Sequence, residues 1–106
     1  MSPKQSVELG RFTDVAFLIL LSLANGPKHG YVIIEDIKAF SGVQFEPGTL
    51  YGALLRLENK GWIEALEAQE RRHPYRITPT GQEAFSHQFN TLEQLVNVGK
   101  QRLALN

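Results

Sequence analysis

The spacing of apolar residues changes from helical to alternating and back along this chain, and this pattern constrains the fold more than any other feature. Up to Gly61 the apolar residues recur at intervals of three and four, as they do in helices. Over residues 62–66 and 74–78 they alternate with polar residues, as in strands, and beyond Thr78 the helical interval returns. The sequence therefore predicts a mainly α protein with one small β-hairpin.

The first expected helix is the most apolar segment of the chain. It starts at Thr13 and Asp14, whose hydroxyl and carboxylate suit the free amides and the positive end of a helix dipole, and it ends near Ala24. The run VAFLILLSLA over residues 15–24 is apolar on nearly every side, which predicts a position at the centre of the fold or between subunits. It is too short for a membrane span, which needs roughly 20 residues.

Two amphipathic helices follow this segment. The second helix is expected from about His29 to Phe40. Ile33, Ile37 and Phe40 have the spacing of a buried face. The third helix is expected over residues 47–60, because the proline at its start suits a first helical position. Its predicted buried stripe consists of Leu50, Leu54 and Leu57.

The last expected helix begins after Thr78, which can cap it, and runs almost to the end of the sequence. Its apolar residues recur at steps of four and three, the spacing of a helix that packs lengthwise against another helix. No earlier helix has the length to be that partner, so we expect a second copy of the chain and hence a homodimer. The predicted interface residues are Phe85, Phe89, Leu92, Val96, Gly99 and Leu103.

The predicted order of elements is that of a winged helix-turn-helix: three helices, a hairpin and a further helix. In that fold the third helix enters the major groove of DNA, and the hairpin, or wing, lies beside the phosphates. We therefore expect a winged helix-turn-helix domain over residues 1–80 and a dimerisation helix over 81–106. Because winged helices also serve as protein-binding modules, the fold alone does not decide the function.

Composition argues against several kinds of function. The 106 residues include 11 basic and 11 acidic side chains, so a purely electrostatic binder of nucleic acid is disfavoured. The absence of cysteine excludes a disulfide framework and a thiolate metal site. The three histidines lack ligand-like spacing and no catalytic motif is present, so no metal, cofactor or enzyme is expected. The first residues do not resemble a signal peptide, and we expect a cytoplasmic protein.

Several motifs in this order resemble those of the PadR family of bacterial transcriptional regulators. They are GPKHGY at 26–31, GTLY at 48–51, RLE at 56–58, GWI at 61–63 and YRITPTG at 75–81. The resemblance covers about residues 15–82. The single long helix at the C-terminal end is similar to that of the family's shorter branch, whose members dimerise through it and have no separate effector domain.

This resemblance implies a DNA-binding repressor that recognises a pseudo-palindromic operator as a homodimer. It places Arg56 on the DNA-facing side of the third helix, where its guanidinium can bind a guanine with two hydrogen bonds. Gly48 leaves amides of the first helical turn free for a phosphate. The residues expected to contact double-stranded DNA are His29, Tyr31, Gly48, Thr49, Tyr51, Gly52, Arg56, Lys60, Arg71, Arg72 and His73.

The resemblance also implies a small aromatic effector between the dimer helices, where Phe85 and Phe89 can stack on a flat ring. Three features differ from the family pattern: Gly52 replaces a proline, Glu46 replaces a serine, and the wing lacks a basic tip centred on glycine and proline. Glu46 favours the helix dipole but repels DNA. Zero net charge and the acidic Glu46, Glu67 and Glu70 favour the alternative, a winged-helix module that binds another protein.

Overall fold

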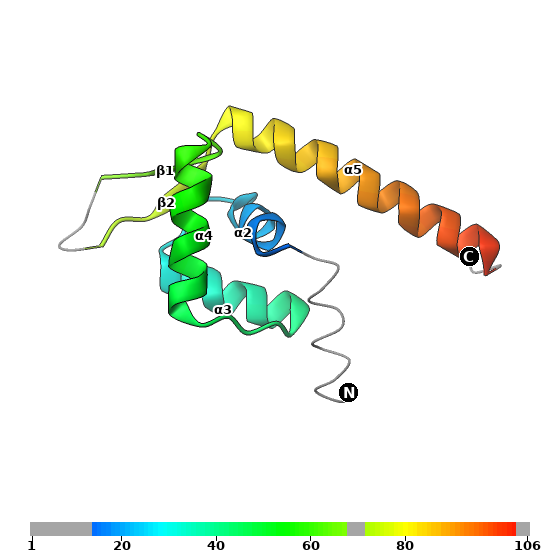
Figure 1. The fold of residues 1–106 in the computed structure, drawn as a ribbon, viewed down its shortest axis with the longest axis horizontal. Coiled ribbons are helices and arrows are strands. Elements are labelled where there is room, and N and C mark those ends of the chain that lie inside the picture. Colours follow the sequence, from blue (N-terminus) through cyan, green and yellow to red (C-terminus); the bar gives the residue numbers. More distant parts are fainter. Residues whose placement is uncertain (1–13, 68–71, 104–106) are drawn as a thin grey trace.

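The computed structural model of this protein describes residues 14–67 and 72–103. Its helices and strands follow the order expected from the sequence, and the mainly α fold with one hairpin is confirmed. Figure 1 shows a helical body, a hairpin that projects on one side and a long helix that projects on the other. The elements are α2 Val15–Leu23, α3 Gly30–Ser41, α4 Pro47–Asn59, β1 Ile63–Ala65, β2 Tyr75–Ile77 and α5 Pro79–Arg102.

Helix α2 lies at the centre of the fold, as its apolar sequence predicts. It contacts α3, α4, α5 and β2 (Figure 1). Phe17, Leu20 and Leu23 are among its buried residues. The helix begins after Asp14, whose carboxylate accepts a hydrogen bond from the Ala16 amide at 3.1 Å. The predicted role of Thr13 in this cap lies outside the described residues.

Helix α3 buries one face against this centre. Ile33 and Ile37 are fully buried, as their spacing predicts. The same prediction was wrong for Phe40, whose side chain is 43% exposed. The last turn of α3 lies away from α4 and no described element covers it, so helical spacing alone does not bury a side chain there (Figure 1). His29 holds the N-cap position, but its side chain forms no capping hydrogen bond.

Helix α4 has the predicted buried stripe. Leu50, Leu54 and Leu57 are almost inaccessible to solvent, and Ala53 lies with them. Pro47 is the first helical residue, where its missing N–H costs no hydrogen bond. Gly61 follows the helix with a φ of 76°, a left-handed conformation that favours glycine. The predicted start of this helix is therefore confirmed, and the helix ends at Asn59, one residue before the predicted end.

The wing is an antiparallel hairpin that is extended by a third segment. Ile63 pairs with Ile77, and Ala65 pairs with Tyr75. On its other edge, Tyr75 exchanges two backbone hydrogen bonds with Lys28, at 3.1 and 2.9 Å. The turn before α3 is thereby joined to the wing, so the start of α3 and the base of the wing form one rigid unit.

The start of α5 is fixed by three hydrogen bonds of Thr78. Its hydroxyl accepts from the Gly81 amide at 3.0 Å and donates to the Gly61 carbonyl at 2.6 Å. Its amide donates to the Trp62 carbonyl at 2.9 Å. A Cβ atom at Gly81 would collide with that same Trp62 carbonyl. The YRITPTG motif therefore joins the wing to α5 through a close contact between Gly81 and the Trp62 backbone, which requires glycine.

Beyond this junction α5 extends away from the body (Figure 1). The ring of Phe85 stacks on Phe17 of α2, with ring centroids 5.1 Å apart, so this member of the predicted interface stripe packs within the chain. Farther along, α5 exposes the large apolar side chains of Phe89, Leu95, Val96 and Val98, and Leu103 directly after the helix is exposed too. Among the described residues, no helix has both the length and the apolar character to cross a membrane.

Candidate nucleic-acid interface

The outer face of α4 lies opposite its buried leucines. Thr49, Arg56 and Asn59 are exposed on this face, and Gly52 is half-buried. A Cβ atom built at Gly48 would have no neighbour within 4 Å, so the first turn is open to a close approach by another molecule. The helix thus separates into a face that packs and a face with hydrogen-bonding groups and no packing role.

The N-terminus of α4 leaves two backbone donors available. The amides of Gly48 and Thr49 donate to no acceptor within the described residues. Glu46 occupies the N-cap position, yet its side chain accepts no capping hydrogen bond. Such free amides, together with the helix dipole, attract an anion. The exposed Glu46 carboxylate stands beside them as an opposing charge.

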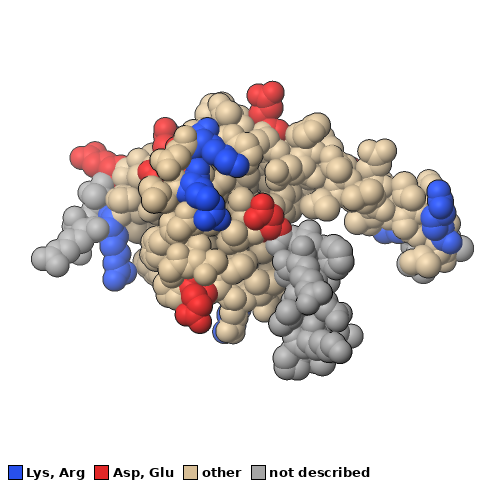
Figure 2. Space-filling model, viewed as in Figure 1, with Lys and Arg blue, Asp and Glu red and all other residues tan. Residues whose placement is uncertain are grey.

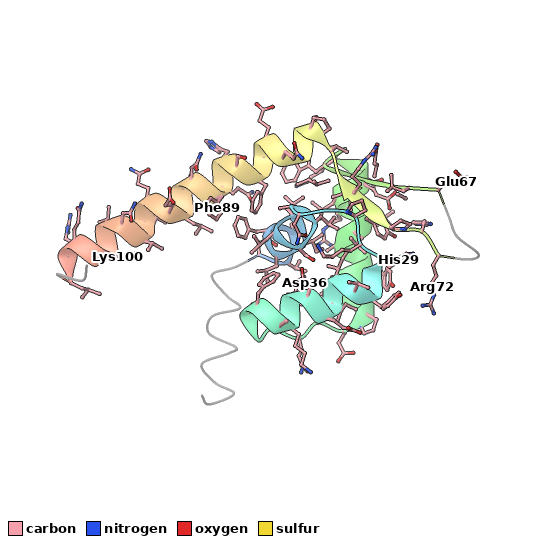
Figure 3. The ribbon with its side chains drawn as sticks, turned by 180° about the vertical axis from the view of Figure 1, so that it is seen from behind. His29, Asp36, Glu67, Arg72, Phe89 and Lys100 are labelled. Atoms are coloured by element: carbon pink, nitrogen blue, oxygen red, sulfur yellow. The ribbon has the colours of Figure 1, made fainter. Side chains whose placement is uncertain are left out.

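Arg72 and His73 of the wing lie beside the start of α3. Figure 3 shows Arg72 extending from the wing on the side where His29 opens α3. The Arg72 guanidinium lies 5.4 Å from the centre of the Tyr31 ring, a cation–π distance. His73 meets Tyr75 edge to face, with 5.2 Å between ring centroids. The predicted contribution of Arg71 lies outside the described residues.

Two other basic residues near this surface are engaged within the chain. Lys60 places its ammonium 4.7 Å from the centre of the Trp62 ring. Arg76 forms an ion pair with Glu64 on the neighbouring strand. Figure 2 shows basic side chains over the C-terminal half of α4 and below the wing, with acidic side chains around them. The surface is therefore locally basic and not uniformly so, in agreement with the balanced total charge.

A hollow of about 280 Å³ lies between the start of α3, α4 and the wing. We call it the tyrosine hollow, because it contains all three tyrosines of the chain. It brings together five of the predicted DNA-contacting residues, whereas Gly48, Thr49, Gly52, Arg56 and Lys60 lie outside its lining. The lining residues are His29, Gly30, Tyr31, Tyr51, Arg72, His73 and Tyr75.

Sequence reasoning missed Gly30 and Tyr75 as members of this site. The alternating strand pattern could have identified Tyr75. Of the residues of that strand that face inward, it is the one with a hydroxyl. Tyr75 is 8% exposed, and its hydroxyl forms no hydrogen bond within the described residues. Burial raises the pKa of Tyr75, and the nearby charges of Glu58 and Tyr51 act in the same direction. The hydroxyl therefore remains a proton donor at neutral pH.

The described residues contain no group of three or more histidine, aspartate or glutamate side chains placed to hold a metal ion. The donors of the site are instead backbone amides, tyrosine hydroxyls, a guanidinium and imidazoles. Such groups bind phosphates and the edges of bases. The chemistry of this surface thus matches that of a nucleic-acid interface.

Comparison with known proteins gives a consistent result. The family model described as the transcriptional regulator PadR-like family matches residues 19–87. An uncharacterised 37.1 kDa protein in a transposon of Streptomyces fradiae is 41% identical over 85 residues, which are 80% of this chain and 25% of that protein. The chain therefore spans about a quarter of the length of this relative.

Two solved structures illustrate the likeness in fold. A PadR family transcription regulator from Clostridium difficile has a TM-score of 0.75 and 26% identity, with 84% of this chain and 97% of that chain covered. A transcriptional regulator from Clostridium thermocellum has a TM-score of 0.71 and 31% identity, with 81% of this chain and 89% of that chain covered.

Proposed function

Because this chain belongs to the transcriptional regulator PadR-like family, we propose that it is a sequence-specific repressor that binds a pseudo-palindromic operator as a homodimer. The observation that carries this proposal is the division of α4 into two faces. Its leucine face is buried in the body, while Thr49 and Arg56 stand exposed on the opposite face. A helix anchored in this way can enter the major groove without loss of its own packing.

Each exposed group of α4 has a defined role in this proposal. The Arg56 guanidinium donates two hydrogen bonds to the O6 and N7 atoms of a guanine. The amides of Gly48 and Thr49 bind a phosphate at the positive end of the helix. Gly52 permits close approach of the backbone, and Lys60 binds a phosphate beyond the helix end. Tyr51 offers its hydroxyl to the DNA near the start of α3.

The wing contributes interactions that do not depend on sequence. Arg72 and His73 line the same hollow as His29 at the start of α3, where the DNA backbone passes in a winged-helix complex. Their interactions with phosphates position the protein along the duplex, while α4 reads the bases. We extend this role to Arg71, which precedes them in the sequence.

Two copies of α5 supply the dimer interface in this proposal. The exposed apolar side chains of its distal part give it a surface that a second copy can cover. The pairing places two α4 helices on one face of the dimer and relates them by a two-fold axis, which fits a pseudo-palindromic operator. A small aromatic effector that binds between the α5 helices, beside Phe85 and Phe89, would shift operator affinity by preferring one spacing of the two α4 helices.

Removal of the Arg56 side chain tests the role of α4. Arg56→Ala is expected to weaken operator binding by about 1–3 kcal/mol, because the two hydrogen bonds to guanine can no longer form. Fluorescence anisotropy at fixed salt measures this change. Arg102→Ala, which removes an exposed arginine at the far end of α5, is the matched control and should leave affinity nearly unchanged. Equal effects of the two variants would contradict the assignment.

Neutralising the wing arginines tests the interactions with phosphates. Replacing Arg71 and Arg72 with glutamine is expected to reduce the steepness with which affinity falls as salt rises. The log–log slope should fall by about 0.9 for each phosphate that the protein no longer neutralises. Titrations at several salt concentrations give that slope. An unaltered slope would show that neither arginine binds a phosphate.

The alternative function is a winged-helix module that binds another protein. Zero net charge and the exposed carboxylate of Glu46 at the start of α4 are the observations in its favour. A mobility-shift experiment with the promoter region of the protein's own gene separates the two functions. Weak binding that is equal for promoter and scrambled duplexes would favour the protein-binding module.

A further inference from the structure

The tyrosine hollow has a composition that the proposed base recognition by α4 does not explain. It gathers all three tyrosines and two of the three histidines of the chain, although its lining comes from segments far apart in the sequence. No aspartate or glutamate of the described residues lines it. Its polar groups can donate hydrogen bonds, which is the pattern of a site for an anion.

The N-terminus of α3 opens into this hollow. The helix has 12 residues, no acidic residue in its first turn and no side-chain cap from His29. The amides of Gly30 and Tyr31 donate to no acceptor within the described residues. Free amides at the positive end of a helix dipole attract negative charge. This helix end is therefore suited to an anion and is not satisfied by any described part of the protein.

Tyr75 provides an independent indication of a ligand. Its side chain is more than nine-tenths buried and lines the hollow, yet its hydroxyl forms no hydrogen bond within the described residues. The hydroxyl oxygen itself is accessible from the hollow, because every buried side-chain nitrogen or oxygen atom of the described residues has a hydrogen-bond partner. The ring is fixed by packing, and the hydroxyl is left available to whatever enters the hollow.

The hollow is held in shape before any ligand binds. Lys28 pairs through its backbone with Tyr75, at 3.1 and 2.9 Å, and it directly precedes the residues that begin α3. The Lys28 ammonium donates to the carbonyl of Ser22 and to the side chain of Asn25, which fastens this turn to the end of α2. The donors of β2 and of α3 are thereby fixed relative to each other.

Gly30 brings α4 to the same place. A Cβ atom on Gly30 would lie 2.6 Å from the Tyr51 hydroxyl oxygen, so glycine is what allows this hydroxyl to reach the start of α3. Arg72 closes the hollow from the wing, with its guanidinium over the Tyr31 ring. Donors from α3, α4 and the wing therefore surround one small space.

We propose that the tyrosine hollow is a phosphate site, and that a backbone phosphate of the operator occupies it in the DNA complex. The second part rests on the proposed function. A phosphate offers several oxygens in a tetrahedral arrangement, which suits donors that come from three directions. A phosphate held here would fix α3, α4 and the wing on one DNA strand. Its donors are the amides of Gly30 and Tyr31, the hydroxyls of Tyr51 and Tyr75, and the guanidinium of Arg72.

A titration of the DNA-free protein with inorganic phosphate tests the site itself. The amide resonances of Gly30 and Tyr31 are expected to shift and saturate with phosphate, and not with chloride at the same ionic strength. Tyr75→Phe keeps the buried ring and removes only the hydroxyl, so it should weaken phosphate binding about tenfold with an unchanged melting temperature. His87→Gln, on the exposed surface of α5, is the control and should have no effect. Absence of the shifts, or their persistence at equal strength in Tyr75→Phe, would overturn the site.

Operator duplexes with single neutral methylphosphonate linkages identify the source of the phosphate. A methylphosphonate linkage at one position in each half-site is expected to weaken binding of the wild-type protein about tenfold. The same linkage should have little effect on binding of Tyr75→Phe. If specific binding persists and no position behaves in this way, the hollow takes a free phosphate and the DNA assignment is wrong. If no duplex binds specifically, the proposed function fails, while the titration with inorganic phosphate still decides whether the site exists.

Discussion

Helix α2 and residues 92–103, which comprise the distal part of α5 and the Leu103 that follows it, are both rich in apolar residues, but only those of α2 are buried. The apolar side chains of α2 lie under α3, α4, α5 and the wing. In residues 92–103, by contrast, Leu95 is 62% exposed and Leu103 is 70% exposed. An exposed apolar stripe is unfavourable in water. The chain therefore forms the core around α2 by itself, whereas the apolar surface of residues 92–103 is left for a partner to cover.

The boundary between the two regions lies within α5. Gly81 and Phe85 pack on Trp62 and Phe17, so the first turns of this helix belong to the α2-centred body. Figure 3 shows Phe89 on the underside of α5, near the point where the helix leaves that body. The packed body therefore extends past the proposed division at residue 80 and includes the first turns of α5.

The largest effect on stability is expected when a leucine-to-alanine substitution in α2 is compared with one in the distal part of α5. Leu20→Ala removes a fully buried side chain of α2 and should lower the free energy of unfolding by about 2–5 kcal/mol. Leu95→Ala should change the stability of the monomer by less than about 0.5 kcal/mol, because its side chain is largely exposed. Chemical denaturation at low protein concentration measures both values. Similar losses of stability would remove the contrast between the regions.

The Leu95→Ala variant also tests the proposed dimer interface. A dimer is more stable at higher protein concentration, because association favours the folded state by mass action. We expect Leu95→Ala to weaken this concentration dependence. Sedimentation equilibrium of the wild type and of Leu95→Ala gives their dimer dissociation constants. A monomeric wild type at micromolar concentration would contradict the proposed dimer.

An intermediate effect is expected from adding one methyl group at either end of α5. Gly81→Ala should destabilise the protein by about 1–3 kcal/mol, since its Cβ meets the Trp62 backbone. Gly99→Ala should stabilise the monomer by about 0.5–1 kcal/mol, because nothing lies within 4 Å of its Cβ and alanine favours a helix. Thermal unfolding distinguishes the two signs. A decrease in monomer stability in Gly99→Ala would place that residue in a packed region.

The smallest effect concerns the pH dependence of stability. Burial raises the pKa of Tyr75 from its ordinary value of 10.0. The folded protein therefore retains a proton that the unfolded chain loses, and stability falls as pH rises from about 10 through the raised pKa. Denaturation between about pH 9 and 11 should show a shallower fall for Tyr75→Phe than for the wild type. Parallel curves would mean that folding does not raise the pKa of Tyr75.

The sequence predicted the elements well where local chemistry decides them. Pro47, Gly61 and Thr78 mark helix ends through their own conformational and hydrogen-bonding properties, and the structure places each as expected. The leucine stripe of α4 follows from helical periodicity alone. Such features depend on residues within one or two helical turns, and a single sequence contains that information.

Other features depend on packing between distant segments, which periodicity does not describe. Phe40 has the spacing of a core residue, but the last turn of α3 has no described neighbour to cover it. Phe85 has the spacing of the predicted interface, but it meets Phe17. Five residues of the tyrosine hollow were predicted singly, but they come from distant segments, so their meeting in one hollow could not be predicted before the fold was known.

The most direct test is a competition titration of the wild-type protein between its own promoter duplex and a scrambled duplex of the same composition, at fixed salt. The proposed function predicts that two protomers bind each promoter site, with a preference of about a thousandfold or more over the scrambled sequence. Equal affinity for the two duplexes would contradict sequence-specific recognition by the exposed face of α4.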